Sequence, residues 1–206
     1  MSKRVRIATV AFAIAMMLAA VGCFSPQARH SNNPSASTAS TMAKPTSWTA
    51  ISGTSLPGRW TADAITQAFT AINQKVGANP ADYIQVIIDG YRVAAQAINP
   101  QKRQNVDEYA YDGTDVKVTP VDVSRNEPGV IEESAFKSDT VKPEVLAKVM
   151  ASAVKDSGIE DVTLHTVAVE KLFANDPEPM IQAAVSGPRA TKAVRYDLNG
   201  QFQKVV

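Results

Sequence analysis

The chain has 206 residues and a formal net charge of +1, with 21 lysine and arginine residues against 20 aspartate and glutamate residues. This balance, without any cluster of basic residues interleaved with aromatic ones, excludes a charge-driven nucleic-acid surface. The length allows one domain or two small ones.

The first 22 residues have the organisation of a secretory signal peptide. Lys3, Arg4 and Arg6 precede an uncharged apolar segment from Ile7 to Val21. This segment is shorter than the roughly 20 residues that a membrane-spanning helix requires. We therefore expect residues 1–22 to be a signal peptide.

The single cysteine of the chain, Cys23, directly follows small and apolar residues in "LAAVGC". This stretch resembles the lipobox of bacterial lipoproteins, although Leu18 lies two places further upstream than in the commonest pattern. The resemblance implies a diacylglyceryl group on Cys23, which would become the first mature residue. Two or three acyl chains anchor a protein stably, so the expected location is the cell membrane or outer membrane, facing the periplasm or exterior. The alternatives are an ordinary cleaved signal peptide and an uncleaved N-terminal anchor.

Residues 23–60 are expected to form a lipidated, disordered tether. The segment is rich in Ser, Thr, Asn, Pro and Ala, as in "SNNPSASTASTMAKPTS". Such a composition buries too little apolar surface to offset the entropy of ordering the chain.

Residues 61–123 are predicted to form a first unit of one helix and four strands. Apolar residues recur at helical spacing from Ile65 to Val76, which predicts a helix over 62–76 with Thr61 as its N-cap and Gly77 at its end. The dipeptides Asp-Gly at 89–90 and 112–113 are strong signals for hairpin turns.

Residues 142–206 repeat this order after a polar connector over 124–141. The segment 142–158 predicts a helix, and four strands are predicted in 162–172, 180–187, 191–198 and 201–206. The helices are about 82 residues apart, and Tyr111 and Tyr196 are 85 residues apart. We therefore expect an α+β fold with a duplicated unit, each copy being one helix followed by a four-stranded antiparallel sheet. The alternative is a chance similarity of composition.

Apolar residues of the connector are expected to dock on one of the units. These residues are Val130, Ile131, Ala135 and Phe136.

The expected order of elements resembles tandem envelope modules of the PepSY and beta-lactamase-inhibitor-like groups. The resemblance covers roughly residues 61–206 and rests on element order alone. It implies binding or inhibition of another envelope protein, and it transfers no functional residue.

The sequence contains no recognisable catalytic or metal-binding motif. Of the two histidines, His30 falls in the expected tether and His165 in a predicted strand. There is no nucleophile elbow, phosphate loop, zinc-protease motif or calcium loop. Paired acids in "YDGTDV" and "NDPEP" are explained by turns. We therefore expect no catalytic residue, no metal and no cofactor.

Aromatic and arginine residues of the predicted strands are candidates for a partner-binding surface, because these residue types carry much of the energy of interfaces. The candidates are Tyr83, Tyr91, Tyr109, Tyr111, Arg195 and Tyr196. The alternative is that they stabilise the sheet. The strands at 118–123 and 201–206 are expected at free sheet edges, where Pro120 and Lys204 would hinder pairing with another strand.

These observations favour a non-enzymatic lipoprotein of the cell envelope, held at the membrane by the lipid on Cys23 and binding an envelope protein or a cell-wall partner. A carrier of a lipid or small apolar ligand between sheet and helix is the first alternative. A hydrolase using acidic residues is the second.

Overall fold

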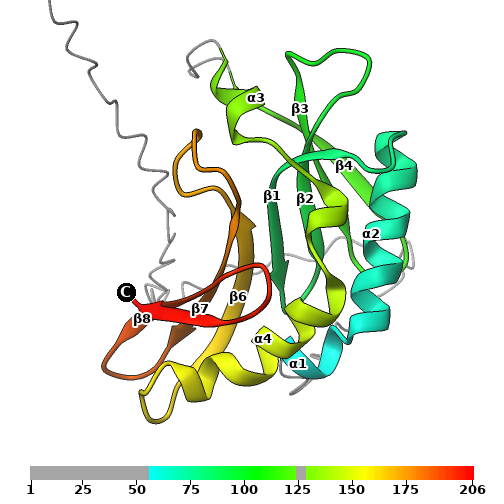
Figure 1. Cartoon of the computed structure of the whole chain (residues 1–206). Helices are drawn as coiled ribbons and strands as arrows, with labels where there is room; N and C mark the ends of the chain where they lie inside the picture. Colours follow the sequence, from blue (N-terminus) through cyan, green and yellow to red (C-terminus); the bar gives the residue numbers. More distant parts are fainter. Residues whose placement is uncertain (1–55, 124–128) are drawn as a thin grey trace, which may run out of the picture. The chain divides into compact units, whose positions relative to one another are not determined.

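The computed structural model describes residues 56–123 and 129–206 (Figure 1). The expected signal peptide, Cys23 and the tether as far as residue 55 lie outside the described residues. The helices are α1 (Leu56–Arg59), α2 (Ala62–Val76), α3 (Val130–Ser134), the 3-10 helix η1 (Ser138–Thr140) and α4 (Pro143–Asp156). The strands are β1 (Asp82–Asp89), β2 (Val93–Ile98), β3 (Val106–Tyr111), β4 (Val116–Val121), β5 (Phe136–Lys137), β6 (Thr163–Glu170), β7 (Met180–Ser186), β8 (Thr191–Tyr196) and β9 (Phe202–Val205).

The nine strands of the described residues form a single antiparallel sheet. Their order is β4-β3-β2-β1-β6-β7-β8-β9, and β5 pairs with the start of β1. The predicted α+β class with antiparallel strands is confirmed. However, the two sets of four strands are not separate sheets, because Gln85–Asp89 of β1 pairs with Thr166–Glu170 of β6. This pairing satisfies backbone groups that would otherwise form two exposed sheet edges.

Helix α2 begins and ends at the predicted residues. The Thr61 hydroxyl oxygen accepts a hydrogen bond from the Ala64 backbone N–H at 3.3 Å, which satisfies one of the free donors of the first turn. Gly77 ends the helix in the left-handed conformation, with φ of 80°. The predicted apolar stripe is the buried face.

Helix α4 also has residues typical of a helix start, a buried apolar face and a glycine after its end. Pro143 occupies the first helical position, where its missing N–H costs nothing. The buried residues Leu146, Val149, Met150 and Ala153 recur at helical spacing, and Gly158 has a positive φ of 65° just after the end. Both predicted helices are therefore confirmed, although Val154, which its helical spacing places with the apolar face of α4, is 39% exposed.

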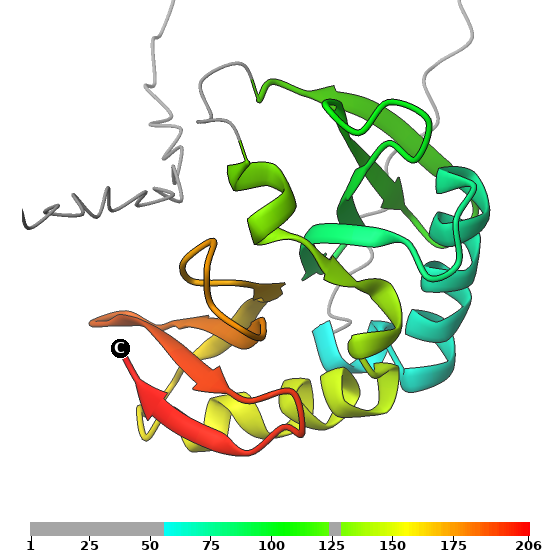
Figure 2. The same cartoon turned by 45° about the horizontal axis from the view of Figure 1, so that its top comes forward.

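One continuous core lies between the helices and the sheet. Helix α2 contacts β2, β3 and β4, whereas α4 contacts β6, β7 and β8. Figure 2 shows both helices on one side of the sheet. At the centre, Ile88 of β1 pairs with Val167 of β6, and both side chains are fully buried. The two halves therefore share a single core.

The folded domain includes residues that the sequence placed in the tether. Leu56 and Trp60 are part of the core, and Trp60 is only 3% exposed. The Trp60 indole N–H also donates a hydrogen bond to the Asp89 carbonyl at 2.7 Å. Two large apolar side chains, one at the start of α1 and one directly after its end, bury enough surface to order this stretch.

The connector is more structured than its composition suggested. Its short strand β5 pairs with β1, placing Phe136 opposite Tyr83 with ring centroids 6.4 Å apart. Phe136 is buried, which confirms the expected docking for this residue, whereas Val130, Ile131 and Ala135 are half-buried. The connector therefore contributes to the first half of the domain.

Strands β1 and β6 each contain one extra residue relative to their hairpin partner. The extra residue is Ile84 in the β1–β2 pair and His165 in the β6–β7 pair. Such bulges bend a strand and redirect the local side chain.

The outermost strands are β4 and β9, as the sequence predicted. Pro120 lies in β4 opposite Asp107. A proline cannot donate a backbone hydrogen bond, which makes an edge less receptive to another strand.

Candidate functional site

Four of the six residues proposed as partner contacts are buried, which corrects that expectation. Tyr83, Tyr109, Tyr111 and Tyr196 all lie in the core beneath the helices. Tyr109 and Tyr111 do share one face of β3, but that face is covered by α2. Aromatic side chains at strand spacing here serve sheet packing, the alternative that the sequence left open.

The other two predicted contacts are accessible but belong to different features. Tyr91 is 80% exposed in the turn between β1 and β2. Arg195 is half-buried on β8 and its Nε donates to the Gln182 Oε1 at 3.3 Å. Gln182 and Gln85 in turn donate to the two carboxylate oxygens of Glu170, at 3.2 and 2.6 Å. Arg195 is thus one end of a polar ladder across β8, β7, β6 and β1.

A groove of about 540 Å³ lies beside α2 and is the strongest candidate site. One wall is the second half of α2 with the following loop at 77–79, and the other is formed by residues 138–143 at η1 and the start of α4. Its volume is within the range of sites that bind small molecules or short polymer segments. The groove is therefore lined by two segments that are distant in the sequence.

Six of the thirteen residues that line the groove carry uncharged hydrogen-bonding side chains. Thr66, Thr70, Asn73 and Gln74 project from α2, and Asn79 follows in the loop. The hydroxyls of Thr66 and Thr70 donate to helix carbonyls four residues earlier, at 2.8 and 2.9 Å. Their oxygen atoms keep acceptor capacity for a ligand.

Asn73 is held in place from the core side. Its Oδ1 accepts a hydrogen bond from the Tyr83 hydroxyl at 2.7 Å, and its Nδ2 lies 3.5 Å from the Asn79 Oδ1. Burial raises the pKa of Tyr83 well above its ordinary value, so this phenol stays protonated and acts as the donor. The orientation of one groove amide is therefore set by a buried tyrosine.

Two charged residues, Asp139 and Lys142, occur among those that line the groove, and both are exposed. They have opposite signs, so the site has no net formal charge. The floor includes the buried apolar side chains of Phe69 and Val141. The site thus combines an apolar floor with neutral polar walls.

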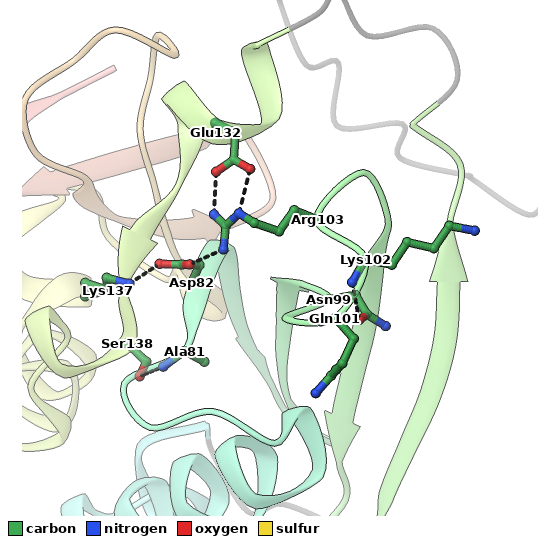
Figure 3. A network of polar contacts seen from close by, with 9 residues as sticks. All are labelled: Ala81, Asp82, Asn99, Gln101, Lys102, Arg103, Glu132, Lys137 and Ser138. Atoms are coloured by element: carbon green, nitrogen blue, oxygen red, sulfur yellow. Dashed lines mark hydrogen bonds and ion pairs between the residues drawn. The ribbon is translucent and has the colours of Figure 1, made fainter.

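A network of ion pairs fastens the connector that carries one wall (Figure 3). Arg103 of the β2–β3 loop contacts both carboxylate oxygens of Glu132 in α3 at 2.9 and 2.5 Å, and Asp82 at 2.9 Å. Lys137 also pairs with Asp82, at 2.5 Å. The next residue, Ser138, accepts a hydrogen bond from the Ala81 N–H at 3.0 Å. The network thereby positions the groove wall that begins at Ser138.

This environment lowers the pKa of Asp82. Partial burial by itself raises the value, but the hydrogen bonds and charges of Lys137 and Arg103 outweigh it. Asp82 is therefore held as a carboxylate between two cations. Nothing in the sequence could reveal this cluster, because its members come from four separate segments.

The described residues place one histidine beside a serine. His165 Nε2 lies 2.5 Å from the Ser186 hydroxyl. His165 is the extra residue of the bulge in β6, and Ser186 pairs with Thr163 at the start of that strand. Among the described residues, no hydrogen bond joins a carboxylate to the other ring nitrogen.

Within residues 56–123 and 129–206, no group of three or more His, Cys, Asp or Glu residues is arranged to hold a metal ion. None of the helices over 56–123 and 129–206 is long and apolar enough to cross a membrane.

The groove residues of α2 were not identified from the sequence, although a signal was present. Thr66, Thr70, Asn73 and Gln74 form a hydroxyl and amide stripe at helical spacing next to the buried face. The opposite wall carries no such signal, because its position depends on the pairing of β5 with β1.

Comparison of the chain with protein-family models, curated proteins and solved structures gave no match.

Proposed function

We propose that this protein is a lipid-anchored component of the bacterial cell envelope whose folded domain binds an envelope protein or cell-wall partner without chemical conversion. The lipobox-like sequence ending at Cys23 supports the anchor. The groove beside α2 is the observation that supports binding, because its lining supplies hydrogen bonds and an apolar floor. The paired acids or activated nucleophile of a hydrolase do not line it.

We further propose that the domain arose by duplication of a unit of one helix and four strands. Helix α4 begins 81 residues after α2, at 143 and 62, and β6 begins 81 residues after β1, at 163 and 82. The bulges at Ile84 and His165 have the same separation. The central β1–β6 register supports this, because it pairs the equivalent residues Ile87 and Ala168 with each other.

If the unit was duplicated, equivalent positions of α2 and α4 can be compared to separate what the fold requires from what binding requires. The buried residues Ile65, Ala68 and Ile72 of α2 have buried equivalents in Leu146, Val149 and Ala153 of α4. The fold therefore specifies the same buried face in both helices.

The groove residues do not follow this rule. Thr66, Thr70, Asn73 and Gln74 of α2 correspond by position to residues of α4 with different chemistry. These are Ala147, Ala151, Val154 and Lys155. Because α4 folds without the hydroxyl and amide stripe, the architecture does not require Thr66, Thr70 and Gln74, whereas Asn73 is also the partner of the buried Tyr83 hydroxyl. The presence of the other three supports a role in binding.

A site-specific crosslinking experiment in intact cells tests the proposed function. A photo-reactive residue replaces Gln74, which lines the groove, in the full-length chain. The matched control replaces Gln67, which is exposed on the same helix outside the groove. We expect one discrete adduct, with a protein or with insoluble cell wall, from position 74 and not from position 67.

Two results would contradict the proposal. Equal adducts from both positions would mean that the groove has no special contact with the envelope. Cys23→Ala should release the chain from the membrane. If adduct formation is then unchanged, the contact does not depend on the lipid anchor, which contradicts that part of the proposal.

A further inference from the structure

We propose that the groove beside α2 binds an uncharged sugar chain that carries N-acetyl groups. This inference rests on the proposed function, because it names the class of partner that occupies the same groove. It follows from three properties of the groove walls: their hydrogen-bonding side chains, the lack of a strand edge among them, and their charge.

The lining matches a ligand that both donates and accepts hydrogen bonds. The Gln74 side chain is exposed and has no hydrogen bond to another described residue, so its amide offers two donors and an acceptor. Thr66 and Thr70 use their protons within the helix and present oxygen atoms as acceptors. Sugar hydroxyls pair with both kinds of group.

The groove lacks the features of the two commonest modes of peptide recognition. Peptides are commonly bound by adding a strand to a sheet edge or by laying an amphipathic helix into an apolar groove. The walls here are α2, a tight loop, η1 and the start of α4, so no strand edge faces the ligand. The buried apolar floor at Phe69 and Val141 is too small for the repeated anchors of a helix.

The apolar floor distinguishes an N-acetylated sugar from a plain one. Phe69, Ala78 and Val141 contribute a small carbon surface to the lining, since Phe69 and Val141 are only 7% and 3% exposed, and the Asn79 amide belongs to the same lining. An acetamido group has a methyl for the carbon surface and an amide for the neighbouring side chains. A sugar that carries hydroxyls alone would leave this surface in contact with water.

The charge of the groove points to a neutral ligand. Asp139 and Lys142 are of opposite sign and are both exposed at the groove. Because the two charges are opposite, neither an anionic nor a cationic polymer gains a net attraction from the groove. An uncharged chain needs none.

Calorimetric titration of the purified full-length protein, held in a detergent without a sugar headgroup, tests this inference. The probes are chitotetraose, which carries an acetamido group on every ring, and cellotetraose, which has the same linkage and only hydroxyls. We expect saturable binding of chitotetraose and at least tenfold weaker binding of cellotetraose. Gln74→Ala should weaken chitotetraose binding at least fivefold, whereas Gln67→Ala should leave it within twofold.

Equal binding of the two sugars, no saturable binding of chitotetraose, or an unchanged affinity of Gln74→Ala would each overturn the inference. Circular dichroism of the variant shows that a loss reflects the groove and not unfolding. If crosslinking from position 74 still yields a discrete adduct while chitotetraose fails to bind, the proposed function stands and the sugar assignment falls. If the adduct is absent too, both fall.

Discussion

The contact between Tyr83 and Asn73 links the core to the groove, and its energetic coupling can be measured. The Tyr83 hydroxyl donates to the Asn73 Oδ1 at 2.7 Å, while the tyrosine side chain itself is fully buried. We predict that Tyr83→Phe lowers the free energy of unfolding by about 1 kcal/mol, the usual net value of one hydrogen bond.

Asn73→Ala should cost more, because it leaves the phenol without its partner. An unsatisfied buried donor costs about 1–3 kcal/mol, and alanine returns roughly 0.5 kcal/mol through its higher helix propensity. The expected net loss is about 1.5 kcal/mol. In the double variant no hydroxyl remains to be left unsatisfied and alanine returns the same roughly 0.5 kcal/mol, so the total loss should be only about 0.5 kcal/mol. The coupling energy is therefore about 2 kcal/mol.

Urea unfolding followed by circular dichroism, on the wild type and the three variants, gives this coupling directly. Additivity of the two single substitutions to within about 0.3 kcal/mol would refute the reasoning, because it would mean that the two side chains act independently. Asn73→Ala should in addition weaken ligand binding in the groove, whereas Tyr83→Phe should have a smaller effect there.

Three further predictions concern stability. Trp60→Ala should lower the free energy of unfolding by about 3–5 kcal/mol in urea, since the side chain is buried; a loss below about 1 kcal/mol would place Trp60 outside the domain. Gly187→Ala should cost about 1–3 kcal/mol, because the new Cβ would lie 2.8 Å from the Asp161 carbonyl oxygen, whereas the control Gly90→Ala meets no atom within 4 Å; equal midpoints for the two variants would contradict this. Because the folded protein holds the pKa of Asp82 below its ordinary value, it binds fewer protons than the unfolded chain, so the stabilisation from Asp82 is present above about pH 4 and lost as the pH falls further. Asp82→Asn should flatten that part of a stability–pH profile, and an unchanged slope would argue against the ion pairs.

Local patterns allowed much of the fold to be predicted from the sequence. The Thr61 cap, the Gly77 stop and the apolar spacing between them define α2, and the Asp-Gly turns define two hairpins. These features depend on residues within a few positions of each other. They therefore leave a clear pattern in one sequence.

The assignment of the tyrosines failed for a physical reason. Strand alternation shows that Tyr109 and Tyr111 share a face, but it does not show which face the helices cover. The same limit applies to the groove, whose second wall depends on long-range pairing between β1 and β5. The stripe on α2 could have been found by comparing the two predicted helices position by position, since only one of them carries it.

The central claim is that a lipid on Cys23 holds a binding domain at the envelope, and intact mass spectrometry of the native protein tests it most directly. We predict a mass equal to residues 23–206 plus a diacylglyceryl group, with or without a third acyl chain. Cys23→Ala should abolish this modified species. A native protein that begins at another residue, or at Cys23 without any acyl mass, would contradict the lipid anchor. The groove would then belong to a protein that is not held at the membrane by a lipid on Cys23.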